Sequence, residues 1–162
     1  MRSVLSSFVF FLAVTSGGCS QSPSTSSPSV MEFPVQKPDA VWQQELTPEQ
    51  YRVLREQGTE RPYSSPLYYV DDAGVYHCAG CKSPLFTADT KFDAHCGWPS
   101  FYAPVNEKSV VERKDFSHGM IRTEVLCGQC GGHLGHVFPD GPNPTGLRYC
   151  INGAALDFTP KP

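Results

Sequence analysis

Residues 121–138 read IRTEVLCGQCGGHLGHVF, a candidate strand followed by a pair of cysteines. Its first part has the length and β-branched content of a strand, and it runs directly into Cys127-x-x-Cys130, where glycine permits a tight turn. The same arrangement occurs upstream, where the strand-like run 74–78 leads into Cys78-x-x-Cys81. Two such turns after strands are typical of a zinc site made by four thiolates.

The spacing of the two cysteine pairs limits how such a site is assembled. Forty-five residues separate Cys81 from Cys127, more than in a compact zinc ribbon, so we expect the two halves to come from separate hairpins. In an oxidising compartment the same four cysteines would instead form structural disulfides, or one pair would be redox-active. A mixed site of Cys127, Cys130, His133 and His136 is less favourable, because only two glycines separate Cys130 from His133.

The rest of the chain predicts a mainly β, mostly antiparallel fold with a short helical lead-in. Thr47 as N-cap, Pro48 at the first helical position and Gln50 completing a capping box indicate a helix start, and Gly58 supplies a stop. Further strands are expected at residues 67–70, 74–78, 109–112 and 121–127, with turn signals between many of the strands.

Composition restricts the class of protein. The chain has 162 residues, 40% of them hydrophobic, which suffices for one ordinary core. Its 15 prolines and 14 glycines interrupt long helices. Sixteen acidic and 13 basic side chains give a net charge of -3, and no basic stripe is present, so we expect no nucleic-acid partner.

The first 18 residues have the composition of a secretory signal. Arg2 is followed by an apolar run from Val4 to Val14 that is too short for a comfortable membrane span. Cys19, after two glycines, resembles a bacterial lipoprotein cleavage site, where the cysteine is lipidated; the alternative is cleavage nearby without a lipid. We expect export to the cell envelope or periplasm, a disordered Ser/Pro-rich tether over 19–38, and a folded domain over 39–162.

Two cysteines of the expected folded domain remain once a metal takes four thiols. Cys150 lies in a strand-like run in which Arg148, Cys150 and Asn152 face the same way. A guanidinium beside a thiol favours the thiolate, although a thiol on its own has a pKa of about 8.5 and is mostly protonated at neutral pH. Cys96 is followed by Gly-Trp-Pro, which leaves the aromatic ring little freedom. The alternative for Cys150 is a buried, inert cysteine.

Four segments in this order and spacing, CAGC, HCGWPSFY, CGQCGGHLGHVFPDGP and RYCING, resemble the methionine sulfoxide reductase B family over nearly all of residues 46–158. The resemblance implies two antiparallel β-sheets of the β-tent type, a short N-terminal helical region, and one structural zinc ion. The zinc ligands that it implies are Cys78, Cys81, Cys127 and Cys130. In place of the small residue often found before Cys96, this chain has His95.

The resemblance also implies a reaction, namely thiol-dependent reduction of the R-sulfoxide of methionine, as a peptide-methionine (R)-S-oxide reductase that repairs oxidised proteins. Cys150 attacks the sulfoxide sulfur, methionine leaves, and Cys150 becomes a sulfenic acid. Cys96 condenses with it, and a thioredoxin-like donor reduces the Cys96–Cys150 disulfide. No redox cofactor is implied.

The other site residues are expected to shape the pocket and move the proton. Trp98 forms an apolar wall for the methyl group and Phe138 closes the pocket. The remaining expected members are His133 and His136 as proton donors, Asp140 to orient one of them, Arg148 to hold the thiolate, and Asn152 in the same network. No role is assigned to His77 or His118.

Two other functions are compatible with part of the pattern. A zinc-ribbon interaction module without catalysis would explain the four-cysteine set but leaves GWPSF and RYCIN without a purpose. A thiol-disulfide oxidoreductase that uses one CxxC needs a thioredoxin-like βαβ context, which is absent from the sequence pattern. For the reductase we expect methionine sulfoxide, free or in proteins, as substrate, a monomer, and membrane contact only through a lipid on Cys19.

Overall fold

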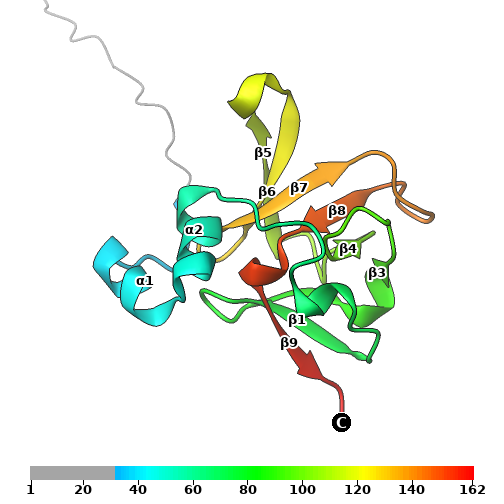
Figure 1. Ribbon diagram of the computed structural model, residues 1–162, viewed down its shortest axis with the longest axis horizontal. Helices are drawn as coiled ribbons and strands as arrows, with labels where there is room; N and C mark the ends of the chain where they lie inside the picture. Colours follow the sequence, from blue (N-terminus) through cyan, green and yellow to red (C-terminus); the bar gives the residue numbers. More distant parts are fainter. Residues whose placement is uncertain (1–31) are drawn as a thin grey trace, which may run out of the picture. The chain divides into compact units, whose positions relative to one another are not determined.

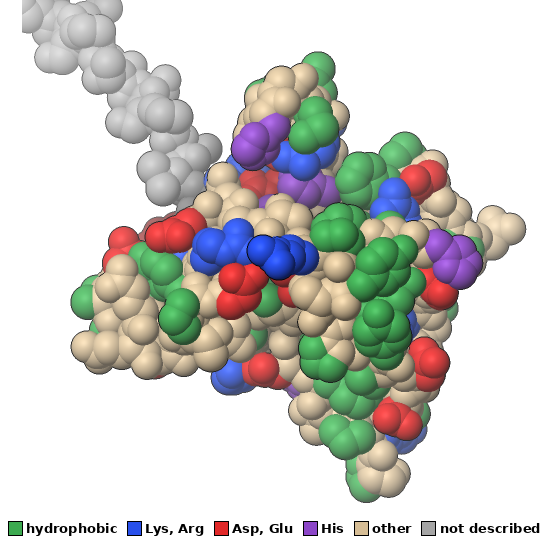
Figure 2. Space-filling model, viewed as in Figure 1, with side chains coloured by type: hydrophobic (Ala, Val, Ile, Leu, Met, Phe, Trp, Pro, Cys, Tyr) green, Lys and Arg blue, Asp and Glu red, His purple; other side chains and the backbone are tan. Residues whose placement is uncertain are grey.

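The computed structural model describes residues 32–162. The expected signal, Cys19 and most of the expected tether lie outside the described residues. Residues 32–162 form two antiparallel sheets and two short helices (Figure 1), which confirms the expected fold class. Within this range, no helix has both the length and the apolar character needed to span a membrane. On the face shown in Figure 2, basic and acidic side chains are interspersed.

The smaller sheet has three strands in the order β2-β1-β9. Its central strand β1 (Gly74–Cys78) pairs with β2 (Pro84–Thr87) and with β9 (Leu156–Pro160). The larger sheet has six strands in the order β3-β4-β8-β7-β6-β5. These are β3 (Lys91–Phe92), β4 (Ser100–Phe101), β5 (Val110–Asp115), β6 (Arg122–Cys127), β7 (His133–Phe138) and β8 (Arg148–Ile151).

The middle of the larger sheet brings the expected site residues together. In the β7–β8 pair His136 lies opposite Cys150, and in the β4–β8 pair Ser100 lies opposite Cys150. Glycine is required at position 135, because a Cβ there would lie 2.1 Å from the carbonyl oxygen of Cys150. Arg148 and Cys150 are partly exposed while Tyr149 and Ile151 are buried, so the expected alternation along β8 is confirmed.

The helices are α1 (Asp39–Glu45) and α2 (Pro48–Glu56). The capping box is confirmed: Thr47 Oγ1 accepts from the Gln50 amide at 3.2 Å, and Gln50 Oε1 accepts from the Thr47 amide at 3.0 Å. The residue that ends α2 in the left-handed region is Gln57 (φ 58°) rather than the expected Gly58. Helix α1, which sequence patterning did not single out, buries Trp42.

The expected strand at residues 67–70 is wrong. Pro66–Tyr68 form a 3-10 turn, η1, in which Ser65 Oγ accepts from the Leu67 amide at 3.2 Å. Pro66 has no amide hydrogen for a strand ladder and fits the first position of a helical turn. The other 3-10 turns are η2 (Ala88–Thr90), η3 (Ser117–Gly119) and η4 (Gly153–Ala155).

The core lies between the two sheets and continues under the helices. The rings of Phe86 and Phe101 stack at 4.4 Å, joining a strand of each sheet. Trp42 and Leu54 pack against the first cysteine turn at Gly80. Residues 32–38, assigned to the tether from composition, include Val35, which packs on this core and donates its amide to the Gln129 carbonyl at 2.8 Å.

Candidate functional site

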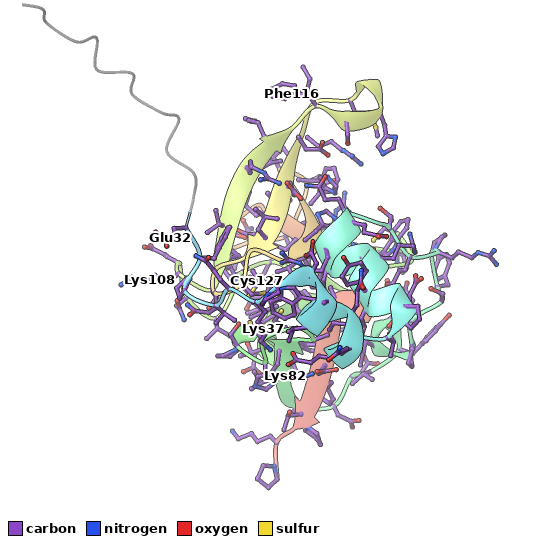
Figure 3. The ribbon with its side chains drawn as sticks, turned by 90° about the vertical axis from the view of Figure 1, so that its left-hand side faces the viewer. Glu32, Lys37, Lys82, Lys108, Phe116 and Cys127 are labelled. Carbon is purple, nitrogen blue, oxygen red and sulfur yellow. The ribbon has the colours of Figure 1, made fainter. Side chains whose placement is uncertain are left out.

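The four cysteines of the two CxxC pairs meet at one point. Their sulfur atoms all lie within 4.8 Å of one another, and three of the four residues are buried. Cys127, labelled in Figure 3, ends β6, and Cys78 ends β1. Each pair thus closes the turn that follows a strand, and the two halves do come from separate hairpins. Gly131, with φ of +68°, donates its amide to the Cys127 carbonyl at 2.8 Å and completes the second turn.

The sulfur geometry fits a tetrahedral metal ion. The Cys78 and Cys130 sulfurs are 3.7 Å apart, and the Cys81 and Cys127 sulfurs are 3.5 Å apart. Zn–S bonds of about 2.3 Å in a tetrahedron place sulfurs roughly 3.8 Å apart. All four cysteines are free thiols, and these short contacts run between the two pairs rather than within them. The four cysteines therefore form a cluster with the spacing of a metal site, and neither His133 nor His136 belongs to this cluster.

The remaining two cysteines of the described residues lie side by side, Cys150 in β8 of the larger sheet and Cys96 in the loop before β4. Their sulfur atoms, on Cys96 and Cys150, are 3.7 Å apart. Cys96 precedes β4, and its sulfur also contacts Ser100 Oγ at 3.4 Å and the Trp98 carbonyl at 3.6 Å. Both cysteines are partly exposed, so a substrate and then a second thiol can reach them.

The contact between the two thiols governs their ionisation. The hydrogen bond with Cys150 lowers the pKa of Cys96 to about 5, with smaller contributions from Ser100 and Trp98. The same contact and then burial raise the pKa of Cys150, while Arg148 lowers it. The pair therefore loses its first proton readily and holds the second, so that one thiolate and one thiol share a proton.

Cys150 opens onto a cavity of about 130 Å³. The lining residues are Thr59, Trp98, Arg122, Gly135, His136, Phe138, Cys150 and Asn152. The cavity thus brings together five of the expected site residues. A larger cleft of about 1110 Å³ lies beside α2, and neither cysteine nor histidine is among its lining residues.

Each of the two expected histidines pairs with a carboxylate that sequence reasoning missed. His136 Nε2 lies 2.8 Å from Asp115 Oδ2, and His133 Nδ1 lies 2.8 Å from Glu124 Oε1. Burial is the main influence on the pKa of His136 and lowers it, whereas the hydrogen bond to Asp115 raises it. One available signal was Glu124, a carboxylate directly before the apolar residues Val125 and Leu126 of β6, where a buried charge needs a partner.

The two histidines differ in their access to Cys150. His136 lines the Cys150 cavity, whereas His133 lines a second cavity of about 160 Å³, which His136 also lines. The two rings are 5.5 Å apart. His133 is buried, and its Nε2 has no hydrogen-bond partner among the described residues. Of the two, His136 is placed to act on a group bound at Cys150.

The expected role of Asp140 is corrected by its contacts. Asp140 accepts two hydrogen bonds from Arg148, at 2.9 Å and 2.8 Å, instead of orienting a histidine. The Arg148 guanidinium also lies 4.5 Å from the centroid of the Phe138 ring. Asp140 therefore holds the cation that stands beside Cys150, because a bidentate carboxylate fixes the plane of a guanidinium.

The side chains of Asn152 and Trp98 are held by main-chain groups and not by Arg148 or Asp140. Asn152 is buried, and its side chain accepts from the Glu60 amide at 3.0 Å and donates to the Leu134 carbonyl at 2.9 Å. Asn152 is expected to hydrogen-bond within the network of the site, but these hydrogen bonds go to main-chain groups. Trp98 Nε1 donates to the Glu60 carbonyl at 3.2 Å.

Comparison with known proteins gives one family. The sequence model of the SelR domain matches residues 46–160 of this chain. The chain is 60% identical to the peptide methionine sulfoxide reductase MsrB of Agrobacterium fabrum over 126 residues, which are 78% of this chain and 93% of that protein. It is 62% identical to the protein of the same name from Bradyrhizobium diazoefficiens over 77% of this chain and 90% of that protein. The match to the namesake from Leptospira interrogans is 59% over 79% of this chain and 98% of that protein.

Proposed function

Because this chain belongs to the SelR domain family, we propose that it is a peptide methionine sulfoxide reductase that acts on the R epimer of the sulfoxide. The observation that carries this proposal is the pair of thiols, Cys96 and Cys150, 3.7 Å apart at a cavity that also holds Trp98 and His136. A binding module has no need of this second pair of cysteines.

The first step uses Cys150 as the nucleophile. When the shared proton lies on Cys96, the thiolate is on Cys150, with Arg148 beside it. The thiolate attacks the sulfoxide sulfur, the S–O bond of the substrate breaks, and one proton is taken up. The products are methionine, reduced by two electrons, and Cys150 sulfenic acid, which carries the oxygen.

The proton comes from His136 in this proposal. Its ring lines the Cys150 cavity, and the Asp115 carboxylate accepts from Nε2, which leaves Nδ1 to serve the sulfoxide oxygen directly or through water. Trp98 and Phe138 supply apolar surface for the methyl group in the same cavity. The His133 ring lies 5.5 Å from the His136 ring and supports it, and Glu124 fixes His133 in turn.

The second and third steps restore the thiols. Cys96 attacks the sulfenic sulfur, a disulfide forms, and water leaves with the oxygen. A dithiol donor of the thioredoxin type then reduces the disulfide by exchange and becomes oxidised itself. The short distance between the two sulfurs supports this cycle.

We assign zinc to the four-cysteine site, because four thiolates in tetrahedral spacing suit this ion. Four protein ligands leave no position for substrate, so the site is structural. It ties the end of β1 in one sheet to the end of β6 in the other.

Export is a separate proposal that rests on residues 1–19 alone. The apolar run before Cys19 supports secretion, with lipidation of Cys19 as the anchor. Labelling with a radioactive fatty acid in cells that express the chain or its Cys19→Ala variant tests this, because only a chain with a lipidated Cys19 takes up the label.

The catalytic proposal is tested with the purified chain, dithiothreitol, and the separated R and S epimers of a methionine sulfoxide peptide. We expect turnover of the R epimer alone and none by Cys150→Ser. Circular dichroism and zinc content establish that the variant is folded. Full activity in Cys150→Ser, or no activity in the folded, zinc-loaded wild type, would contradict the proposal.

A further inference from the structure

Glu60 lies in the segment between α2 and η1 and is buried, with 5% of its surface exposed. Burial raises the pKa of this carboxyl group, and hydrogen bonds from the amides of Gly153 and Ala154 oppose the rise. A carboxylate out of water requires such donors. Within residues 32–162, each hydrogen bond of Glu60 goes to a residue that lines the Cys150 cavity or follows β8.

The side chain of Glu60 binds the chain directly after the strand that carries Cys150. Its Oε1 accepts from the Gly153 amide at 2.5 Å, and its Oε2 accepts from the Ala154 amide at 2.8 Å. These two amides begin η4, which follows β8. The carboxylate therefore fixes the Glu60 segment against the end of the strand that holds the nucleophile.

The main chain of Glu60 binds two residues of the cavity wall. Its carbonyl accepts from Trp98 Nε1 at 3.2 Å, and its amide donates to Asn152 Oδ1 at 3.0 Å. Trp98 and Asn152 line the cavity together with Cys150. One residue thus links the indole ring on one wall to the end of the strand on the other.

We propose that Glu60 is a positioning residue that sets the place of the Trp98 ring relative to Cys150. The inference rests on the proposed function, in which the methyl group of the sulfoxide lies against Trp98 while Cys150 attacks the sulfur. Glu60 acts through Trp98 and the end of β8, not on the reacting atoms, because both of its carboxylate oxygens are taken by amides and it is not among the lining residues of the cavity. Displacement of a positioning group by about 1 Å costs around 10²-fold in rate.

The test compares Glu60→Gln with Glu45→Gln. A glutamine keeps the shape but offers one acceptor oxygen in place of two, so one of the two amides loses its partner. Glu45 carries the same charge on α1, is exposed, and pairs only with Lys37. For a peptide with methionine R-sulfoxide we expect a KM about 10-fold higher in Glu60→Gln, with a smaller fall in kcat, and both constants within 2-fold of wild type in Glu45→Gln.

A spectroscopic readout separates positioning from a loss of stability. Trp42 is 1% exposed and Trp98 is partly exposed, so acrylamide quenching of the indole emission reports mainly on Trp98. We expect stronger quenching in Glu60→Gln, and an intermediate value in Glu60→Asp, which keeps both oxygens on a shorter side chain. A lower melting temperature with unchanged KM and unchanged quenching would overturn the proposal.

Trp98→Phe tests the same link without touching Glu60. It keeps an apolar ring and removes the N–H that donates to Glu60, so we expect KM to rise and to rise no further when Glu60→Gln is added. If the increases in KM from the two substitutions add in the double variant, the link between Glu60 and Trp98 is overturned. If the Glu60 variants do not fold, an unchanged KM in Trp98→Phe overturns it. If the folded wild type reduces no sulfoxide, the proposed function fails, and quenching still decides whether Glu60 holds Trp98.

Discussion

The sulfur atoms of Cys96 and Cys150 lie 3.7 Å apart, although 54 positions separate the two residues in the chain. The β4–β8 pairing and the return of the 96–99 loop toward Ser100 bring them together. A disulfide has an S–S bond of about 2.05 Å, so the two sulfurs need to approach by only about 1.6 Å. The recycling step therefore requires a local movement of the loop and no change in the sheet.

Replacement of Cys96 by serine should stop the cycle after one turn. The first step needs only Cys150, so we expect one methionine per chain without a reductant, both in wild type and in Cys96→Ser. The sulfenic acid should persist only in the variant, because the wild type converts it to a disulfide. Chromatography measures the methionine released per chain, and mass spectrometry after dimedone labelling measures the sulfenic acid on Cys150. A dimedone adduct on Cys150 in oxidised wild type, at the level of the variant, would contradict the role of Cys96.

The four-cysteine site should carry one zinc ion per chain. Structural zinc contributes directly to the free energy of folding, so Cys81→Ser is expected to lose the metal and several kcal/mol of stability, with a fall of more than about 10 °C in melting temperature. Atomic emission and thermal denaturation provide the measurements. Cys96→Ser is the matched control and should retain the metal. Zinc retained at one ion per chain in Cys81→Ser would exclude Cys81 as a ligand.

Local signals in the sequence predicted much of this structure. The strand before each CxxC pair, the capping box at Thr47 and the alternation along β8 depend on neighbouring residues, and all three are present. The expected strand at 67–70 is wrong because Pro66 starts a 3-10 turn there, and the Tyr and Val content of the run does not outweigh it. Short apolar runs are ambiguous in this way.

Partners that depend on strand register could not be read from the chain. Asp115 and Glu124 reach His136 and His133 only because β5, β6 and β7 pair as they do. The partner of Asp140 also depends on the fold. Asp140 lies in the turn between β7 and β8, and this turn directs it to Arg148 and not to a histidine. Side-chain identity indicated the chemistry, and the register decided which groups meet.

The pair of Glu124 and His133 should make stability depend on pH. Burial alone would raise the pKa of Glu124, but hydrogen bonds from His133 and Arg113 outweigh it and leave the pKa lowered. A carboxyl group with a lowered folded pKa stabilises the protein above its unfolded pKa, about 4.3, and this contribution disappears as the pH falls through the folded value. We expect Glu124→Gln to cost about 2–3 kcal/mol at pH 7, because it leaves charged or polar partners without an acceptor.

Urea denaturation at pH 7 and at pH 3 measures the Glu124 effect. The difference in unfolding free energy between wild type and Glu124→Gln should shrink at pH 3. Glu45→Gln, an exposed carboxylate, should change stability by less than about 0.5 kcal/mol at both values. An equal cost for Glu124→Gln at both pH values would mean that packing, and not ionisation, explains the loss.

His136 should determine how the rate depends on pH. Burial lowers the pKa of His136 below its ordinary value of about 6.5, with Asp115 opposing, so little of the protonated form exists at neutral pH. If this form supplies the proton to the sulfoxide, kcat/KM should rise as the pH falls from 8 toward 6. The lowered pKa of the thiol pair, about 5 at Cys96, keeps one thiolate present over this range.

Substitution of His136 should then remove both the rate and the slope. General acid catalysis contributes about 10²–10⁴-fold, so we expect His136→Gln to lose at least about 10²-fold in kcat/KM and to show a flat profile. Asp115→Asn removes the group that raises the His136 pKa, so its profile should shift to lower pH, with a smaller loss at pH 7. His118→Gln, exposed in η3, is the control and should match wild type. A wild-type slope that survives in His136→Gln would assign the proton to another group, and His133 would be the next to substitute, because its ring lies 5.5 Å from the His136 ring.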